Sequence, residues 1–204
     1  MEISAAQVKE LREKTGAGMM DCKKALSETT GNFEKAIEYL RKKGIASAAK
    51  KSGRMAKEGT ITSYIHGEGK VGILVEVNCE TDFVARTYQF RQFVKDLAMH
   101  VAAANPQWVR SEEVPSEILA KEKEIALAQM QASGKPAAVL EKIAEGKVKK
   151  FYEENCLLHQ PFVKDSSKTI EQLLKETIAT LGENIVIRRF ARYVLGEGIQ
   201  EINP

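Results

Sequence analysis

The sequence has few cysteines and no pair of them at a spacing typical of a metal site or a disulfide framework. Its three cysteines are Cys22, Cys79 and Cys156, and none belongs to a C-x-x-C motif. An odd number of scattered thiols without a histidine cluster indicates reduced cysteines rather than a zinc site. We therefore expect a cytoplasmic protein that holds no metal.

The chain also lacks long hydrophobic runs and a strong excess of charge. No stretch approaches the roughly 20 apolar residues that a membrane-spanning helix needs. The N-terminus begins directly with an amphipathic helical pattern, so no signal peptide is expected. The net charge of +3 is too small to indicate nucleic-acid binding by itself. With 43% hydrophobic and 29% charged residues, the composition is typical of a globular protein.

Recognisable catalytic motifs are missing as well. The sequence contains no GxSxG, P-loop or HExxH pattern, and its GxGxxG match at 67–72 lies in the turn of a predicted β-hairpin rather than between a strand and a helix. The three histidines, His66, His100 and His159, lie far apart. For His100, which follows an apolar helical stripe, an interior or interface position is the default interpretation. Because no acid, base, nucleophile or metal ligand stands out, we expect neither enzymatic activity nor a cofactor.

The patterns that are present divide the chain into three parts. Residues 1–44 predict three short helices that end at Gly44, a unit whose small core is typical of a docking module. Residues 45–58 are rich in Ala, Lys and Ser and indicate a linker with helical tendency. Residues 59–204 predict an α+β core. It contains a β-hairpin at 60–77 and a third strand at 184–195, giving a three-stranded antiparallel sheet, with a helical hairpin at about 116–156 and an extended connector at 160–165.

The stretch 78–86 joins the second strand of that β-hairpin to a helix expected over 83–104. Thr81 and Asp82 supply a helix N-cap, and Asp82 could equally act as a partner of the helix dipole. Phe83 lies about two helical turns before Phe90, and this periodicity favours an ordinary core residue. The alternative is an exposed ring on a rigid corner, where it could act as a wedge.

Two further stretches leave alternatives open. Met19 and Met20 follow a glycine-rich turn and could form a soft contact surface, or one of the two could fill the core. The linker carries several basic residues that could touch RNA. No aromatic residues interleave with them for base stacking, which favours a solvated linker.

Four motifs carry a resemblance to a known family. They are TGAGMMDCKKAL at 15–26, VNCETDFVAR at 77–86, QPFVKD at 160–165 and GENIVIRRF at 182–190. In this order, and over essentially the whole chain, they resemble bacterial-type translation elongation factor Ts, the family of guanine-nucleotide exchange factors for elongation factor Tu. The resemblance implies a ubiquitin-associated-like (UBA-like) three-helix N-terminal domain, a linker and an α+β core with a helical hairpin. One set of sheet strands matches the short form of the family, which implies a homodimer.

The resemblance also implies which residues contact elongation factor Tu in its GDP form. Residues Thr81, Asp82, Phe83 and Val84 would enter the partner near its nucleotide and disturb the Mg²⁺/phosphate site, with Phe83 pushing between helices. The N-terminal contacts implied are Arg12, Met19, Met20 and Lys23, and those of the core are His100, Val163, Leu181 and Gly182. The family often has Asn and an acidic residue where Thr87 and Tyr88 stand here. An alternative function is RNA or ribosome binding through the basic linker and Arg188, Arg189 and Arg192; the exchange-factor reading expects no direct contact with nucleic acid or membrane.

Overall fold

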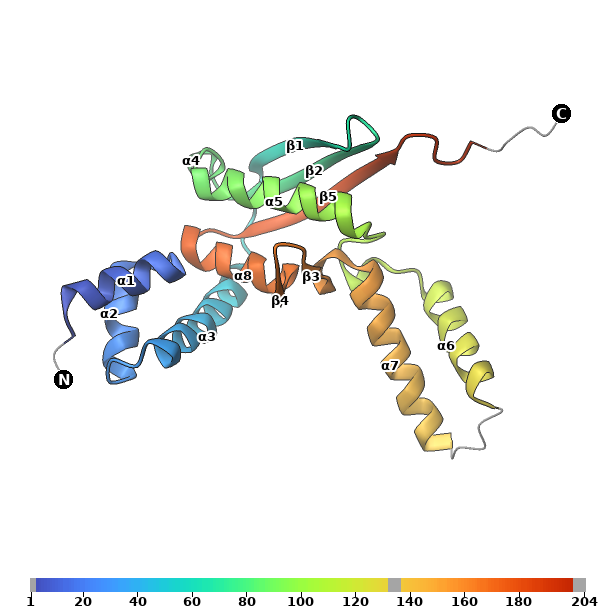
Figure 1. Ribbon diagram of the computed structural model, residues 1–204, viewed down its shortest axis with the longest axis horizontal. Coiled ribbons are helices and arrows are strands. Elements are labelled where there is room, and N and C mark those ends of the chain that lie inside the picture. The colour runs from blue at the N-terminus through green and yellow to red at the C-terminus, as the bar shows by residue number, and fades with distance from the viewer. Residues whose placement is uncertain (1–2, 132–136, 200–204) are drawn as a thin grey trace. The chain divides into compact units, whose positions relative to one another are not determined.

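The computed structural model describes residues 3–131 and 137–199 and shows an α+β protein (Figure 1). Two compact units can be distinguished. The first contains the residues up to Ile61 together with Glu76–Val94 and Gln172–Ile187. The second contains Thr62–Val75, Lys95–Glu171 and the residues from Arg188 onward. The α+β class is confirmed, whereas the predicted division at residues 44 and 58 stays a prediction.

The N-terminal part forms the three predicted helices. They are α1 (Ala5–Thr15), α2 (Met19–Glu28) and α3 (Phe33–Lys51). Ser4 and Gln7 form a complete capping box before α1, and Gly16 ends that helix in the left-handed conformation at φ 66°. Asn32 caps α3 by accepting a hydrogen bond from the backbone N–H of Lys35. The small core of this part consists of Val8, Leu11, Cys22, Ala25, Leu26 and Ala36.

The prediction that Gly44 ends the third helix is wrong. Helix α3 continues without interruption to Lys51, through half of the segment interpreted as a linker. One glycine inside a helix costs only about 1 kcal/mol. The alanines and lysines that follow are strong helix formers and outweigh that cost. A glycine alone is therefore a weak stop signal when good helix formers continue the run.

The predicted three-stranded antiparallel sheet is confirmed, with the strand order β1-β2-β5. Its strands are β1 (Glu58–His66), β2 (Val71–Cys79) and β5 (Ile185–Val194). In β2, alternate residues from Ile73 to Cys79 are buried, as expected for a strand with one face on the core. Gly59 has φ 137°, and a Cβ there would lie 2.1 Å from the carbonyl oxygen of Val77. Only glycine allows the two strands to approach so closely at this point.

The helix expected over 83–104 is in fact two helices. The single turn α4 (Asp82–Ala85) is followed by α5 (Tyr88–Ala104). Thr87 lies between them, and its hydroxyl donates to the carbonyl oxygen of Val84 and accepts from the N–H of Phe90. Thr87 thus closes one helix and caps the next, so the helical phase does not run through from Phe83 to Phe90.

The predicted helical hairpin is confirmed as α6 (Ser116–Gln131) and α7 (Ala137–Asn155), two helices that pack side by side (Figure 1). The residues of the turn between them, 132–136, lie outside the described residues. Short 3₁₀ turns precede α6 at Ser111–Glu113 and follow α7 at Leu157–His159. Within the described residues, none of the helices combines the length and the apolar character required to cross a bilayer.

The extended connector expected at 160–165 is a small β-hairpin instead. Strand β3 (Pro161–Phe162) pairs antiparallel with β4 (Asp165–Thr169), and Val163 and Lys164 form the turn. Pro161 and the polar residues of this stretch do not look like strands in the sequence, and each strand is too short to show alternation. Helix α8 (Ile170–Leu181) follows directly and ends at Gly182, whose φ is 81°.

Candidate functional site

Phe83 is exposed on a hydrogen-bonded corner between β2 and α5. Its exposed fraction is 78%, whereas Phe90, seven residues later in the first turn of α5, is completely buried. The interpretation of Phe83 as a core residue is therefore wrong. The physical reason is the break at Thr87, which puts Phe83 on a separate helical turn that does not share the buried face of α5. The structure thus presents a large ring to solvent, as the wedge interpretation requires.

The neighbouring residues of the corner have defined partners. Thr81 is the N-cap of α4, with extended backbone angles and a side chain that accepts from the N–H of Val84. The carboxylate of Asp82 pairs with Arg86 at 2.8 Å across one helical turn. Both side chains of this pair remain substantially exposed, so the pair can be rearranged at little cost.

A second loop holds the corner through two glutamates. One oxygen of Glu183 accepts hydrogen bonds from the backbone N–H groups of Glu80 (3.1 Å) and Thr81 (3.0 Å). Its other oxygen accepts from the Thr81 hydroxyl at 2.6 Å. In return, Glu80 accepts from the backbone N–H of Asn184 at 2.6 Å. We call this set of reciprocal bonds between residues 80–81 and 183–184 the glutamate clasp.

The buried side of the corner contains a thiol. Cys79 is fully buried, and its Sγ donates to the carbonyl oxygen of Thr81 at 3.1 Å. Burial, with a smaller contribution from the Glu183 carboxylate, raises the pKa of Cys79 to about 11. Burial likewise raises the pKa of Cys156 to about 11, with Glu113 and Glu112 adding to it. Both thiols are therefore protonated at neutral pH, and Cys79 supplies a structural donor rather than a nucleophile.

The clasp brings two groups of predicted site residues together. Leu181 and Gly182 end α8 immediately before Glu183, so they lie at the same corner as Thr81 and Asp82. Sequence reasoning missed Glu80, Glu183 and Asn184 as parts of this site. The only signal was the pair of polar residues between the glycine that ends α8 and the following strand.

The predicted residues of the N-terminal helices are all exposed. Met19 and Met20 have exposed fractions of 45% and 77%, so neither fills the core. Arg12 lies in the last turn of α1, and Lys23 lies on α2. All four side chains are available at the surface, although no described contact joins them into one cluster.

His100 is buried, unlike the other predicted site residues, and it has a partner for each ring nitrogen. The N–H of Val163 donates to Nδ1 at 3.3 Å, so Nε2 carries the proton and donates to Gln160 at 3.0 Å. Burial lowers the pKa of His100, partly offset by the bond to Gln160. His100 therefore cannot itself touch a partner in this structure. It supports the turn that presents Val163, whose side chain is 46% exposed.

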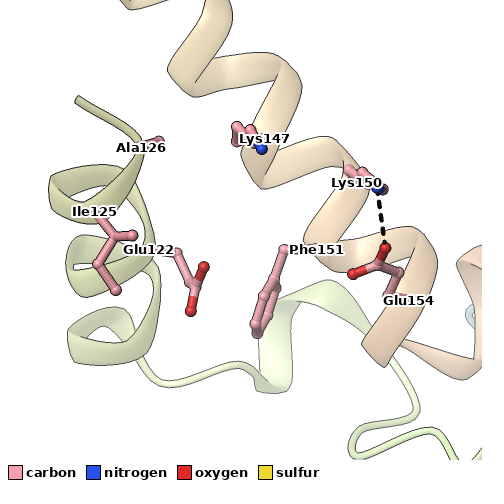
Figure 2. Close-up of a pocket in the computed structure, with 7 residues that line it drawn as sticks. All are labelled: Glu122, Ile125, Ala126, Lys147, Lys150, Phe151 and Glu154. Atoms are coloured by element: carbon pink, nitrogen blue, oxygen red, sulfur yellow. Dashed lines mark ion pairs between the residues drawn. The ribbon is translucent and has the colours of Figure 1, made fainter. Parts of the chain in front are cut away.

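The helical hairpin of α6 and α7 contains a shallow groove lined by both acidic and basic side chains (Figure 2). Phe151 lies at its centre, with Glu122 and Ile125 on the α6 side, and Lys150 pairs with Glu154 at 3.5 Å. This arrangement has no convergent polar groups of the kind that fix a small ligand. Among the side chains that the structure describes, no three His, Cys, Asp or Glu residues come together as a possible metal site.

The three arginines of the alternative function do not all lie on one face of the sheet: Arg188 and Arg192 share a face, and Arg189 lies on the other. Arg188 and Arg189 are neighbours on β5, and successive residues of a strand point to opposite faces of the sheet. Arg192 is half-buried. A groove that follows a nucleic-acid backbone requires basic side chains on one side, so this geometry favours the exchange-factor interpretation.

The fold and the corner together define the class of protein. It is an α+β protein with an N-terminal helical part, whose candidate site is an exposed, hydrogen-bonded corner suited to the surface of a macromolecule. The family model described as "Elongation factor TS" matches residues 3–197. The chain is 62% identical to elongation factor Ts of Geobacter sulfurreducens over 201 residues, covering 98% of this chain and 93% of that protein. It is 64% identical to that of Geobacter metallireducens over 199 residues (98% and 92%), and 62% identical to that of Moorella thermoacetica over 197 residues (97% of each). The chain belongs to the elongation factor Ts family.

Proposed function

We propose that this protein is a guanine-nucleotide exchange factor for elongation factor Tu and that it promotes GDP release by inserting Asp82 and Phe83 near the Mg²⁺/phosphate site. The observation that carries the proposal is the 78% exposure of Phe83 on a corner fixed by hydrogen bonds. Single exposed apolar residues are common at protein surfaces, but an aromatic ring on a fixed support is the kind of side chain that anchors the centre of an interface. A rigid support lets the ring enter another protein without first losing conformational freedom.

The proposed mechanism needs no covalent chemistry. A bound nucleoside diphosphate is held mainly by backbone amides around its phosphates and by Mg²⁺. Phe83 would push apart the elements that support this grip, and Asp82 would compete for hydrogen bonds there. Each tenfold increase in GDP release requires about 1.4 kcal/mol. By linkage, bound nucleotide weakens the exchange factor's own binding by the same factor, which allows GTP to expel it.

The other predicted residues have supporting roles in this proposal. Arg12, Met19, Met20 and Lys23 would dock the N-terminal helices on the partner. Their exposure supports this role. Leu181 and Gly182 would contact the partner beside the corner. Val163 would contact the partner from the turn that His100 holds in place.

We also propose that the protein is a homodimer, on the basis of the short-form resemblance, and that it is cytoplasmic, on the basis of its scattered, odd-numbered cysteines. Its sheet has an apolar outer face that could serve as the contact. Ile65 is 64% exposed and lies 3.5 Å from the position of a Cβ on Gly72, and Leu74, two residues along β2, is 46% exposed. Sedimentation equilibrium should give twice the chain mass of 22.7 kDa. A monomer at micromolar concentration would contradict this part of the proposal.

The decisive experiment is the release of fluorescent GDP from elongation factor Tu with and without this protein. Release should accelerate with protein concentration and then saturate. An unchanged release rate would reject the function. The RNA-binding alternative is tested by salt, because association with nucleic acid falls steeply as salt rises. Tight RNA binding with that dependence, together with unchanged GDP release, would favour the alternative.

A further inference from the structure

We propose that Glu183 is a positioning residue, whose carboxylate sets the orientation of the corner that presents Phe83. This inference rests on the proposed function and assigns a role to a residue outside the segment that enters the partner. Glu183 lies just after α8, about a hundred residues from the corner in sequence, and it is only half-buried.

The geometry gives Glu183 more bonds to the corner than any other described side chain. Its carboxylate accepts three hydrogen bonds, two from consecutive backbone N–H groups and one from the Thr81 hydroxyl. Thr81 is also the N-cap of α4, since its hydroxyl oxygen accepts from the N–H of Val84. The direction in which α4 leaves the strand therefore depends on Thr81, and the rotamer and backbone of Thr81 depend on Glu183. Phe83 follows two residues later in this single turn.

The second half of the glutamate clasp fixes Glu183 in turn. Asn184 is buried, its N–H donates to Glu80, and its side chain donates to the carbonyl oxygens of Arg54 (2.7 Å) and Ser52 (3.5 Å). Glu183 is thus attached to a loop whose own position is determined by several bonds. A carboxylate on such a loop is a firm support rather than a surface side chain that happens to reach the corner.

A carboxylate matches the donors at this position better than an amide does. All three partners are donors, and they approach both oxygens of the group. In Glu183→Gln the side chain keeps its shape, but one oxygen is replaced by an NH₂ group, which cannot accept from the backbone N–H groups; facing the Thr81 hydroxyl instead, it can only donate, and that hydroxyl must reverse its role. The substitution therefore either removes the two backbone bonds or keeps the three contacts without a charged acceptor, and it leaves the packing unchanged. This makes Glu183→Gln a sharper test than truncation.

The first measurement uses the protein alone. In Glu183→Gln, amide hydrogen exchange at Glu80, Thr81 and Val84 should accelerate by about tenfold or more, because the charge-assisted bonds to the backbone amides are lost or replaced by weaker neutral ones. The matched control is Glu197→Gln, which removes the same charge from an exposed position and should leave these amides unchanged. Unchanged exchange at all three amides in Glu183→Gln would overturn the proposal.

The second measurement separates positioning from general stabilisation. Glu183→Gln should lower the maximal stimulated rate of GDP release by about tenfold, with a smaller change in the concentration needed for half-saturation. In a Phe83→Ala background the same substitution should lower the maximal stimulated rate by less than about twofold, because no ring is left to orient. An equal loss in both backgrounds would overturn the inference. A different result would reject the proposed function itself, namely a stimulated rate that is unchanged in Phe83→Ala alone.

If Glu183→Gln does not fold, two variants of Thr81 test the same contact from the other side. Thr81→Ser keeps the hydroxyl that Glu183 accepts from, and Thr81→Val keeps the shape without it. The stimulated rate of Thr81→Val should lie about tenfold below that of Thr81→Ser, since the two variants differ in the hydroxyl. Equal rates for the two variants would refute the link between Glu183 and the corner.

Discussion

Truncation of Phe83 should separate stability from exchange activity. Complete burial of a phenylalanine makes its replacement by alanine cost about 3–5 kcal/mol. Phe83 is 78% exposed, so only about a fifth of that contribution applies, and the free energy of unfolding should fall by less than about 1 kcal/mol. Phe90 is fully buried, and Phe90→Ala should show the whole cost. Urea unfolding of both variants measures this difference within one segment of the chain.

The effect on exchange should be much larger than the effect on stability. An aromatic ring at the centre of an interface commonly contributes about 2–4 kcal/mol to binding or to the activated complex. That range corresponds to roughly a 30- to 1,000-fold loss in the stimulated rate of GDP release. The assay is stopped-flow release of fluorescent GDP from elongation factor Tu, measured over a range of exchange-factor concentrations.

Tyr88→Ala provides the matched control. Tyr88 is 77% exposed and stands only five residues after Phe83, but it belongs to α5 rather than to the corner. Its truncation should change release by less than about threefold. Equal losses for Phe83→Ala and Tyr88→Ala would show that exposed aromatic area, not the corner, is responsible. Unfolding of Phe83→Ala would show that the ring supports the fold, and the reasoning from its exposure would be refuted.

Other predictions concern titration and docking. Burial lowers the pKa of His100 in the folded protein. As the pH drops, the imidazole therefore takes up a proton at a higher pH in the unfolded chain than in the folded one, and the free energy of unfolding should fall below about pH 6.5. This fall should be shallower in His100→Gln when urea midpoints are compared. The raised pKa values of Cys79 and Cys156 have the opposite consequence: stability is retained below about pH 9 and lost progressively towards pH 11, and alanine variants should reduce that loss. Met20→Ala should weaken binding to elongation factor Tu by about 5- to 30-fold in calorimetry, whereas Met55→Ala, at a position 70% exposed, should not.

Local patterns in the sequence predicted most of the elements. The capping box at Ser4, the left-handed glycine at position 16 and the N-cap at Thr81 are decided by residues within one helical turn, and the predicted N-cap at Thr81 is confirmed. The alternation in β2 depends on burial of one face and was equally visible. These features could be predicted because the side chain that causes each one is next to the backbone that it fixes.

Phe83 shows where local reasoning was misleading. Its spacing to Phe90 fits a continuous helix, and the interpretation as core followed from that assumption. One threonine hydroxyl between them donates to the end of α4 and accepts from the start of α5, which shifts the helical phase. Periodicity cannot detect such a break, because Thr87 is compatible with both arrangements. The resemblance to the family, rather than the pattern, pointed to an exposed ring.

The glutamate clasp could not be predicted from any window of the sequence. Glu183 and Thr81 meet because α8 ends at a left-handed glycine and the following strand pairs with β2. Neither condition fixes the contact alone; the loop must also carry a carboxylate at the residue that faces two free N–H groups. Long-range polar contacts of this kind require the three-dimensional structure.

The supports around Phe83 also explain how an exposed ring can be effective at the surface of another protein. An exposed side chain on a mobile loop would lose rotational and backbone freedom on insertion, at a cost of about 1–2 kcal/mol for each residue ordered. Here the bonds from Glu183, the Thr81 cap and the Thr87 break fix the backbone on both sides of the ring before any partner arrives. More of the binding energy of the ring is then available to displace elements of the partner. The same reasoning explains why the Asp82–Arg86 pair is exposed, since an ion pair at the tip must rearrange on insertion and a buried pair would resist that change.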